Sequence, residues 1–209
     1  MKIIKPSYEI IDTLDATEIL KKIELCGRVC YKSEDKITEN SAREFVKQII
    51  KAGHESVLEH FSFSVRFITD RGVSHEIVRH RMASYSQEST RYCNYSNDKF
   101  NGEITVVEPH QIGEQKSNWL KACKISEEQY FELLKTTTPQ TARAVLPTSL
   151  KTELIMTANL REWRHFFKLR TAKAAHPDMR VLTIPLLKEL KQLIPVVFDD
   201  IYEEEINND

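Results

Sequence analysis

The feature that most constrains the fold is a period-two alternation over residues 61–68. Large apolar side chains stand at Phe61, Phe63, Val65 and Phe67, and mostly polar side chains stand between them. Because successive side chains of a strand point to opposite faces, this pattern predicts a strand with one buried face. The chain is therefore expected to contain a sheet, so it is not purely helical.

Most of the remaining apolar residues recur at helical spacing. This spacing predicts helices over residues 17–30, 38–52, 73–80, 117–135, 138–145, 160–170 and 177–193. Further strands are predicted over residues 103–107 and 150–158. Asp15 and Thr38 are the expected N-caps of the first two helices, and Gly53 is expected to end the second. No repeat or domain boundary is evident, so we expect one domain over residues 1–209, of the α+β class, with mixed helices and an antiparallel-type sheet.

Charge and composition exclude several classes of protein. Lys and Arg number 30 against 31 Asp and Glu, which leaves a net charge of -1 and no general attraction for nucleic acid. Any anion site must therefore be local. No apolar run is long enough for a membrane span or a signal peptide, so a cytoplasmic protein is expected. The acidic run at residues 203–205 is expected to be solvated.

Residues 79–91, RHRMASYSQESTR, concentrate the groups that bind phosphate. Arg79, His80, Arg81 and Arg91 supply cations. Five hydroxyl groups lie between them, at Ser84, Tyr85, Ser86, Ser89 and Thr90. Guanidinium groups bind phosphate through paired hydrogen bonds, and hydroxyl and backbone N–H groups complete such sites. The segment predicts a site for a phosphorylated ligand, with a solvated basic loop or a nucleic-acid patch as alternatives.

Two further clusters accompany this segment. Arg161 and His165 share one helical face, one turn apart, away from the apolar side of the same helix. Residues 53–60, GHESVLEH, hold two histidines and two carboxylates, but their spacing matches no zinc motif and no cysteine supports one. We therefore expect no metal site.

In combination these clusters resemble the flavin-dependent thymidylate synthase family. The family signature is Arg-His-Arg, seven residues and Ser, which corresponds here to residues 79–81 and Ser89. GHESVLEH, RAVLP at residues 143–147 and the stretch from Asn159 to AHPDMR at 175–180 are similar to the family's other motifs. The resemblance covers roughly residues 20–185 and implies methylation of dUMP to dTMP, with methylenetetrahydrofolate as carbon donor and FAD reduced by NADPH. It also implies a homotetramer with shared active sites.

The resemblance assigns roles residue by residue. The residues implied to hold FAD are Ser56, Glu59, Arg79, His80, Arg81, Asn159, Arg161 and His165. Those implied to bind dUMP are Glu76, Arg79, Gln87, Glu88, Ser89, Thr90, Arg91, Arg143 and Arg170. Arg170 is expected to polarise the pyrimidine, Arg79 to stabilise charge on flavin or substrate, and His54 to lie where folate or NADPH approaches.

This chain departs from the family at the nucleotide site. Gln87 stands where a glutamate is common, and Glu76 where a neutral amide is frequent, so a related pyrimidine nucleotide hydroxymethylase is an alternative. A non-enzymatic nucleotide- or RNA-binding module is a more distant alternative. No cysteine lies in a motif suited to attack on the pyrimidine, so we expect the cofactor to carry the chemistry without a cysteine nucleophile.

Overall fold

The predicted strand at residues 61–68 is present and belongs to a four-stranded sheet. The computed structural model describes residues 1–202, and its strand β3 (Ser62–Asp70) buries Phe63, Val65 and Phe67. The strand order is β2-β3-β6-β4, with β2 at Ser7–Ile10, β4 at Ala83–Gln87 and β6 at Lys151–Asn159. The acidic run 203–205 lies outside the described residues.

The central pair of strands is antiparallel, as the sequence predicts. The backbone N–H of Arg71 donates to Thr148, and that of Leu160 donates to Phe61. Along β3 the residue numbers rise while those of the paired residues in β6 fall, which is the antiparallel arrangement. The Ser64 and Thr157 hydroxyl groups, 2.8 Å apart, follow the same register.

The helices follow the predicted order with shifted ends. The α-helices are α1 (Ala16–Tyr31), α2 (Ser41–Lys51), α3 (Arg71–Ile77), α4 (Lys116–Leu134), α5 (Pro139–Ala142), α6 (Leu160–Arg170) and α7 (Pro177–Leu193). The 3-10 helices are η1 (Glu34–Lys36), η2 (Glu55–His60), η3 (Asp98–Phe100), η4 (Gly113–Gln115) and η5 (Arg143–Val145). None of the helices among residues 1–202 is long and apolar enough to cross a bilayer.

The expected caps are confirmed in part. Asp15 accepts from the backbone N–H groups of the first turn of α1, and Gly53 follows α2 with a φ of 73°, the left-handed conformation that suits glycine. The expected cap at Thr38 is wrong. Helix α2 begins three residues later, after Asn40, because the Ser41 hydroxyl bonds back to Thr38 and holds that segment in a turn.

The chain divides into two compact units. The first consists of residues 1–8, 66–79 and 85–155, and the second of residues 9–65, 80–84 and 156 onward. The expectation of one domain over residues 1–209 stays a prediction.

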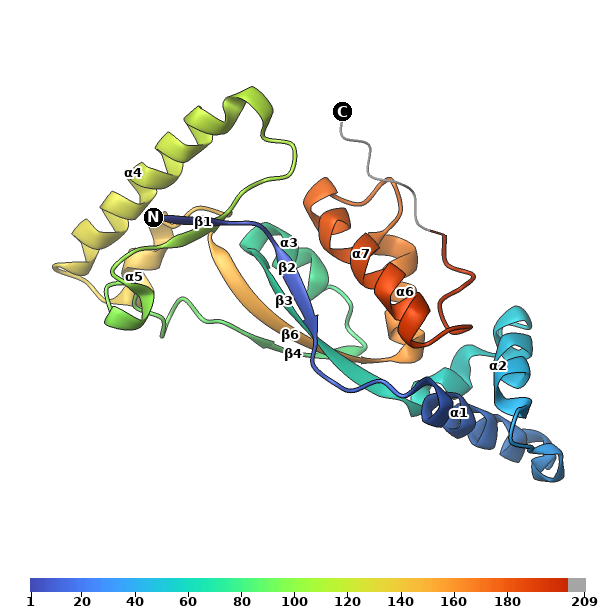
Figure 1. Ribbon diagram of the computed structural model, residues 1–209. Coiled ribbons are helices and arrows are strands. Elements are labelled where there is room, and N and C mark those ends of the chain that lie inside the picture. The colour runs from blue at the N-terminus through green and yellow to red at the C-terminus, as the bar shows by residue number, and fades with distance from the viewer. Residues whose placement is uncertain (203–209) are drawn as a thin grey trace. The chain divides into compact units, whose positions relative to one another are not determined.

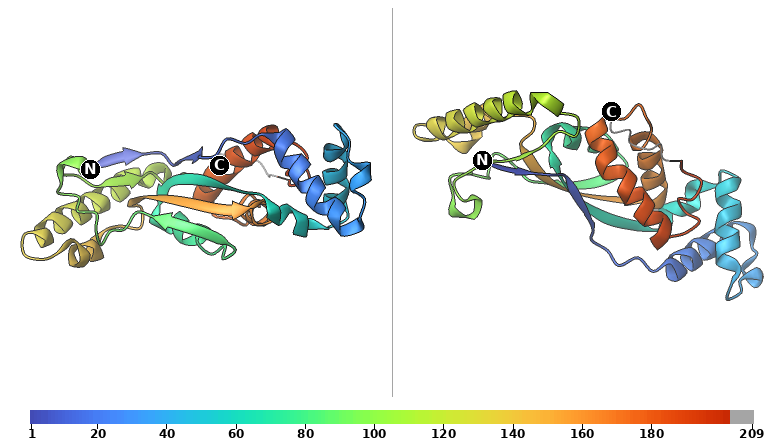
Figure 2. Two further views of the ribbon diagram at one scale, coloured as in Figure 1. Left: turned by 90° about the horizontal axis from the view of Figure 1, so that it is seen from below. Right: turned by 45° about the horizontal axis from the view of Figure 1, so that its top comes forward.

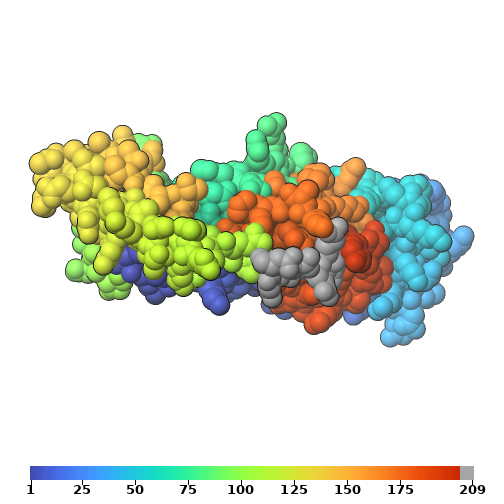
Figure 3. Space-filling model, turned by 90° about the horizontal axis from the view of Figure 1, so that it is seen from above, coloured from blue at the N-terminus to red at the C-terminus, as the bar shows by residue number. Residues whose placement is uncertain are grey.

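The first unit packs around an aromatic cluster. Strand β1 (Lys2–Ile4) pairs in parallel with β5 (Thr105–Val107), and α4 packs on α5 (Figure 1). Tyr95 and Tyr130 are buried, with ring centroids 5.7 Å apart. Only Cys123 and Tyr130 of α4 are buried, so most of this helix lies at the surface (Figure 3).

The second unit packs around Trp163. This indole is fully buried, stacks on Phe63 at 5.0 Å and donates from Nε1 to the Phe63 carbonyl oxygen at 3.2 Å. Phe166 and Phe167 extend the same apolar face of α6, which lies beside α7 (Figure 2). Helix α1 packs on α2, and Gly27 lies at this contact, close to the ring of Phe45. The apolar face of α6 points inward, so its polar face is free to form a site.

Candidate active site

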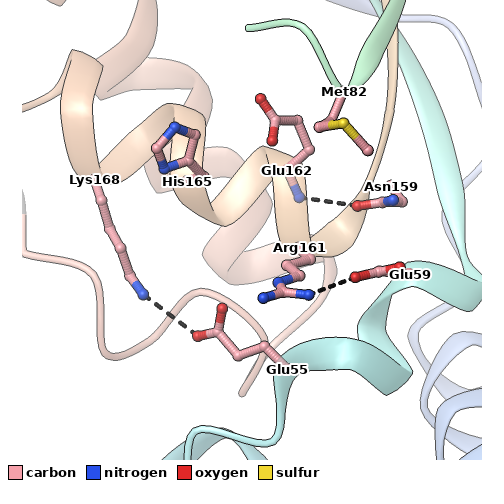
Figure 4. Close-up of a pocket in the computed structure, with 8 residues that line it drawn as sticks. All are labelled: Glu55, Glu59, Met82, Asn159, Arg161, Glu162, His165 and Lys168. Carbon is pink, nitrogen blue, oxygen red and sulfur yellow. Dashed lines mark hydrogen bonds and ion pairs between the residues drawn. The ribbon is translucent and has the colours of Figure 1, made fainter.

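The polar face of α6 lines a pocket of about 460 Å³ in the second unit. Asn159 is the N-cap of α6, because its side chain accepts from the backbone N–H of Glu162 at 2.9 Å. Arg161 and His165 follow on the same face of α6, one turn apart, as predicted. The lining residues of this α6 pocket are Glu55, Glu59, Met82, Asn159, Arg161, Glu162, His165 and Lys168 (Figure 4).

Two ion pairs cross the α6 pocket from α6 to η2. Arg161 Nη1 donates to Glu59 Oε1 at 2.6 Å, and Lys168 Nζ donates to Glu55 Oε1 at 3.3 Å (Figure 4). Arg161 and Glu59 are about half exposed, so a ligand with an anionic group can compete for the guanidinium. The α6 pocket thus offers both cationic donors and carboxylate acceptors.

A buried arginine lies behind the pocket. Arg164 is fully buried and donates from Nε and Nη2 to Glu55 Oε1, at 3.1 and 2.8 Å. It also donates to both carboxylate oxygens of Asp200, at 2.6 and 2.7 Å, and to the Val197 carbonyl. Burial raises the pKa of Glu55, but Arg164 and Lys168 outweigh it and hold that pKa below its usual value. We call Arg164, Glu55, Lys168, Asp200 and the Val197 carbonyl group the Arg164 network.

His80, the centre of the Arg-His-Arg motif, is buried and is not among the pocket-lining residues. Arg170 Nε donates to His80 Nε2 at 3.1 Å, and His80 Nδ1 lies 3.3 Å from Glu162 Oε1. Burial, with the nearby charges of Arg170 and His165, lowers the pKa of His80 to about 4. At neutral pH the ring is therefore uncharged, so its contact with Glu162 is a hydrogen bond and not an ion pair.

The partners of His80 fix its tautomer. An arginine can only donate, so Nε2 must accept and the single ring proton lies on Nδ1, facing Glu162. The side chains of His80, Glu162 and His165 lie close enough to be considered as metal ligands, with ligand atoms within 4.8 Å. The protonated Nδ1 has no free lone pair for a cation, and Arg170 repels one. This triad is therefore poorly suited to a metal.

The first unit brings together part of the predicted nucleotide site. Arg143 Nη1 donates to the Thr90 hydroxyl at 3.2 Å, and both line a pocket of about 540 Å³. Arg71, His75 and Gln140 also line this Arg143 pocket. The site thus combines guanidinium, imidazole, amide and hydroxyl groups, which suits an anionic ligand.

Gln87 and Glu88 lie in a different pocket of the same unit, of about 450 Å³, with Lys151. Gln87 Nε2 donates to the hydroxyl groups of Ser74 and Thr152, at 2.9 and 3.2 Å. Glu88 accepts from Lys151 Nζ at 3.0 Å. Glu88 and the Gln87 amide nitrogen thus have protein partners, whereas the Gln87 carbonyl oxygen has none among residues 1–202 and can bind a ligand.

The other predicted residues occupy varied positions. Ser89 Oγ accepts from the Arg91 backbone N–H at 3.3 Å, and Arg91 Nε donates to Gln140 at 3.0 Å. His54 Nδ1 lies 3.4 Å from the Tyr31 hydroxyl. The exposed predicted residues outside the three pockets are His54, Ser56, Arg79, Arg81 and Arg91, and Glu76 is half-buried in α3. Their assigned roles stay predictions.

Four lining residues of the α6 pocket were not predicted from the sequence. Glu55 and Met82 lie inside segments that the sequence singled out, but neither was assigned a role there, and Glu162 and Lys168 carried no assignment either. A signal did exist for Lys168, which is seven residues after Arg161 and so falls on the same face of α6.

Comparison with known proteins gives one family. The family model described as thymidylate synthase complementing protein matches residues 11–196. A flavin-dependent thymidylate synthase of Geobacter sulfurreducens is 35% identical, over 85% of this chain and 80% of that protein. One of Corynebacterium efficiens is 34% identical, over 87% of this chain and 79% of that protein.

A solved structure has the same fold. The UMP/dUMP methylase PolB from Streptomyces cacaoi, bound with 5-Br dUMP, superposes with a TM-score of 0.78 at 20% identity, over 95% of this chain and 96% of that one. The fold and sequence together define an α+β enzyme. The chain belongs to the flavin-dependent thymidylate synthase family, which confirms the resemblance read from the motifs and argues against a non-enzymatic binding module.

Proposed function

We propose that this protein methylates dUMP to dTMP, with methylenetetrahydrofolate as carbon donor and FAD reduced by NADPH. The observation that carries the proposal is family membership over nine-tenths of the chain, joined to a polar pocket on α6 at the family's motif residues. As part of the same proposal the protein is a cytoplasmic homotetramer with shared active sites, as the family resemblance implies.

The α6 pocket fits a flavin nucleotide. Its volume of about 460 Å³ lies within the usual range for ligand pockets, of roughly 300–1,000 Å³. Arg161 and Lys168 supply cations for phosphate, while Asn159 and Glu59 supply neutral and acidic groups for the rest of the molecule. We assign Ser56, Glu59, Arg79, His80, Arg81, Asn159, Arg161 and His165 to flavin binding. Bound FAD would supply the redox chemistry, and the chain would bind and orient it.

His80 serves this site as a support. It is buried and neutral, and its Nε2 accepts from Arg170, so it fixes the direction of that guanidinium. This arrangement supports the assignment of Arg170 as the residue that polarises the base.

We assign nucleotide binding to the residues that the family resemblance implies. Arg143 and Thr90 line the Arg143 pocket, and Ser89 and Arg91 belong to the same loop. The full assigned set is Glu76, Arg79, Gln87, Glu88, Ser89, Thr90, Arg91, Arg143 and Arg170. Arg79 and Arg170 are assigned to charge stabilisation as well as binding, and His54 to the approach of folate or NADPH.

No cysteine nucleophile is needed in this scheme. Cys123 is buried, and burial is the main cause that raises the pKa of Cys93, which keeps that thiol protonated at neutral pH. Cys93 lines the pocket of Gln87 and Glu88, and none of the four cysteines lines the α6 pocket or the Arg143 pocket. An enzyme with all four changed to serine is expected to retain dTMP formation.

A second candidate activity is hydroxymethylation of a pyrimidine nucleotide. It is favoured by Gln87, an amide where the family commonly has a carboxylate, whose Nε2 is bound to Ser74 and Thr152. An amide can present different hydrogen bonds to a base than a carboxylate can.

Spectroscopy and product analysis test both activities. The purified protein, incubated with FAD, is expected to be yellow and to bleach with NADPH, and to convert dUMP to dTMP when methylenetetrahydrofolate is added. Chromatography of the products from dUMP and dCMP separates methylation from hydroxymethylation. A protein that stays colourless with FAD and forms neither product would overturn the proposal.

A further inference from the structure

The pocket carboxylate Glu55 has one oxygen in use and one free. Its Oε1 atom accepts from Arg164 Nε, Arg164 Nη2 and Lys168 Nζ, at 3.1, 2.8 and 3.3 Å. Among residues 1–202, Oε2 has no hydrogen-bond partner. In Figure 4 the second oxygen points away from Lys168 and toward the space between Arg161 and His165.

Three donors on one oxygen fix the orientation of the carboxylate. Arg164 cannot shift, because it is fully buried and its other N–H groups are bound to Asp200 and to the Val197 carbonyl. Lys168 adds a second charge from the next turn of α6. Glu55 is therefore held with Oε2 presented to the pocket, as a fixed acceptor.

We propose that Glu55 is a ligand-binding residue that accepts a hydrogen bond from a hydroxyl or N–H group of the bound flavin nucleotide, and that Arg164 is the positioning residue that aims it. The inference rests on the proposed assignment of the α6 pocket to FAD. A carboxylate suits this task because it can only accept when ionised, and sugar hydroxyl groups are its usual partners in nucleotide sites.

The geometry gives Glu55→Gln a specific consequence. Arg164 and Lys168 are donors, so the amide carbonyl must take the place of Oε1, which leaves the NH2 group facing the pocket. The variant thus turns an acceptor into a donor at the ligand while it keeps shape and volume. FAD affinity, measured by fluorescence titration, is expected to fall by about tenfold or more, the scale of one lost charge-assisted hydrogen bond.

Glu39→Gln is the matched control, because Glu39 is exposed in the same unit and lines no pocket described above. Its FAD affinity is expected to equal that of the wild type. If the wild-type protein does not bind FAD, the proposed function itself is wrong. Normal FAD binding by wild type and Glu55→Gln alike would leave the proposed function standing and overturn the role of Glu55.

The positioning role of Arg164 is tested by a double-mutant cycle. Arg164→Met is expected to weaken FAD binding by a similar factor, but to have little additional effect in the Glu55→Gln background, because it acts through that side chain. Independent, multiplicative losses would overturn the positioning role. If Arg164→Met does not fold, Asp200→Asn replaces it in the cycle, since Asp200 holds the other side of the guanidinium.

Discussion

Removal of the Arg164 guanidinium is expected to be among the most destabilising single changes in the second unit. Breaking a buried ion pair by removing one partner costs about 3–5 kcal/mol, because the remaining charge stays buried. The side chains of Glu55 and Asp200 are 20% and 47% exposed, so water reaches both carboxylates and the lower end applies. We expect Arg164→Met to lose about 3 kcal/mol of unfolding free energy.

Urea unfolding at one fixed protein concentration measures this loss. With an m-value of about 2–3 kcal/mol/M, the midpoint should fall by about 1–1.5 M. Trp163 lies in the same unit and reports the transition by fluorescence. Arg43→Met, an exposed change on α2, is the control and should stay within about 0.5 kcal/mol of wild type. A midpoint for Arg164→Met equal to that of the control would refute the reasoning.

The same network sets a dependence on pH. For Glu55, burial raises the pKa, but Arg164 and Lys168 lower it by more, so the pKa is below its usual value. For Asp200, the hydrogen bond from Arg164 is the main cause of a lowered pKa. A carboxyl whose pKa is lower in the folded state contributes stability above its unfolded pKa, near 4, and loses it as the pH falls through the folded value. The stability gap between wild type and Arg164→Met should therefore be full at neutral pH and shrink below about pH 4.

One further measurement and two further substitutions test other parts of the structure. Nitrogen NMR of His80 should show a neutral ring with its proton on Nδ1 from neutral pH down to about pH 4, and a charged ring at neutral pH would contradict the bond from Arg170. Gly27→Ala should cost about 1 kcal/mol or more in urea unfolding, because the new Cβ would lie 2.6 Å from the Phe45 ring, and unchanged stability would show that the ring moves aside freely. Ser89→Ala should retain dTMP formation with weaker dUMP binding, whereas complete loss of turnover at unchanged dUMP affinity would identify the serine as a nucleophile.

Much of the fold was predictable from the sequence because it depends on local periodicity. Helix α6 shows this best, since Trp163, Phe166 and Phe167 mark the buried face and Arg161 and His165 the exposed one. Strands β1, β2 and β4 were not expected. They are three, four and five residues long, which is too short for an alternation to stand out.

The candidate site was predictable in composition but not in connectivity. The Arg-His-Arg motif points to the family, but the sequence does not show that His80 is buried against Arg170, 90 residues away. The contacts of the Arg164 network are even harder to predict from the sequence, because Arg164 is 109 residues from Glu55 and 36 residues from Asp200. Such pairs arise from tertiary packing, for which local patterns carry no signal.

Arg161 and Arg164 of α6 differ in burial, and this difference determines which partners each can bind. Arg161 lies on the polar face, half exposed, where its pair with Glu59 is weak enough to yield to a phosphate. Arg164 lies three residues later on the buried face, where its five hydrogen bonds cannot be exchanged for a ligand without leaving charges unpaired. On the proposed assignments, an arginine on the polar face binds the ligand, and an arginine on the buried face holds a carboxylate in position. The difference follows from the helical period and not from any difference in chemistry, so the charge of a residue in a motif says little about its role until its face of the helix is known.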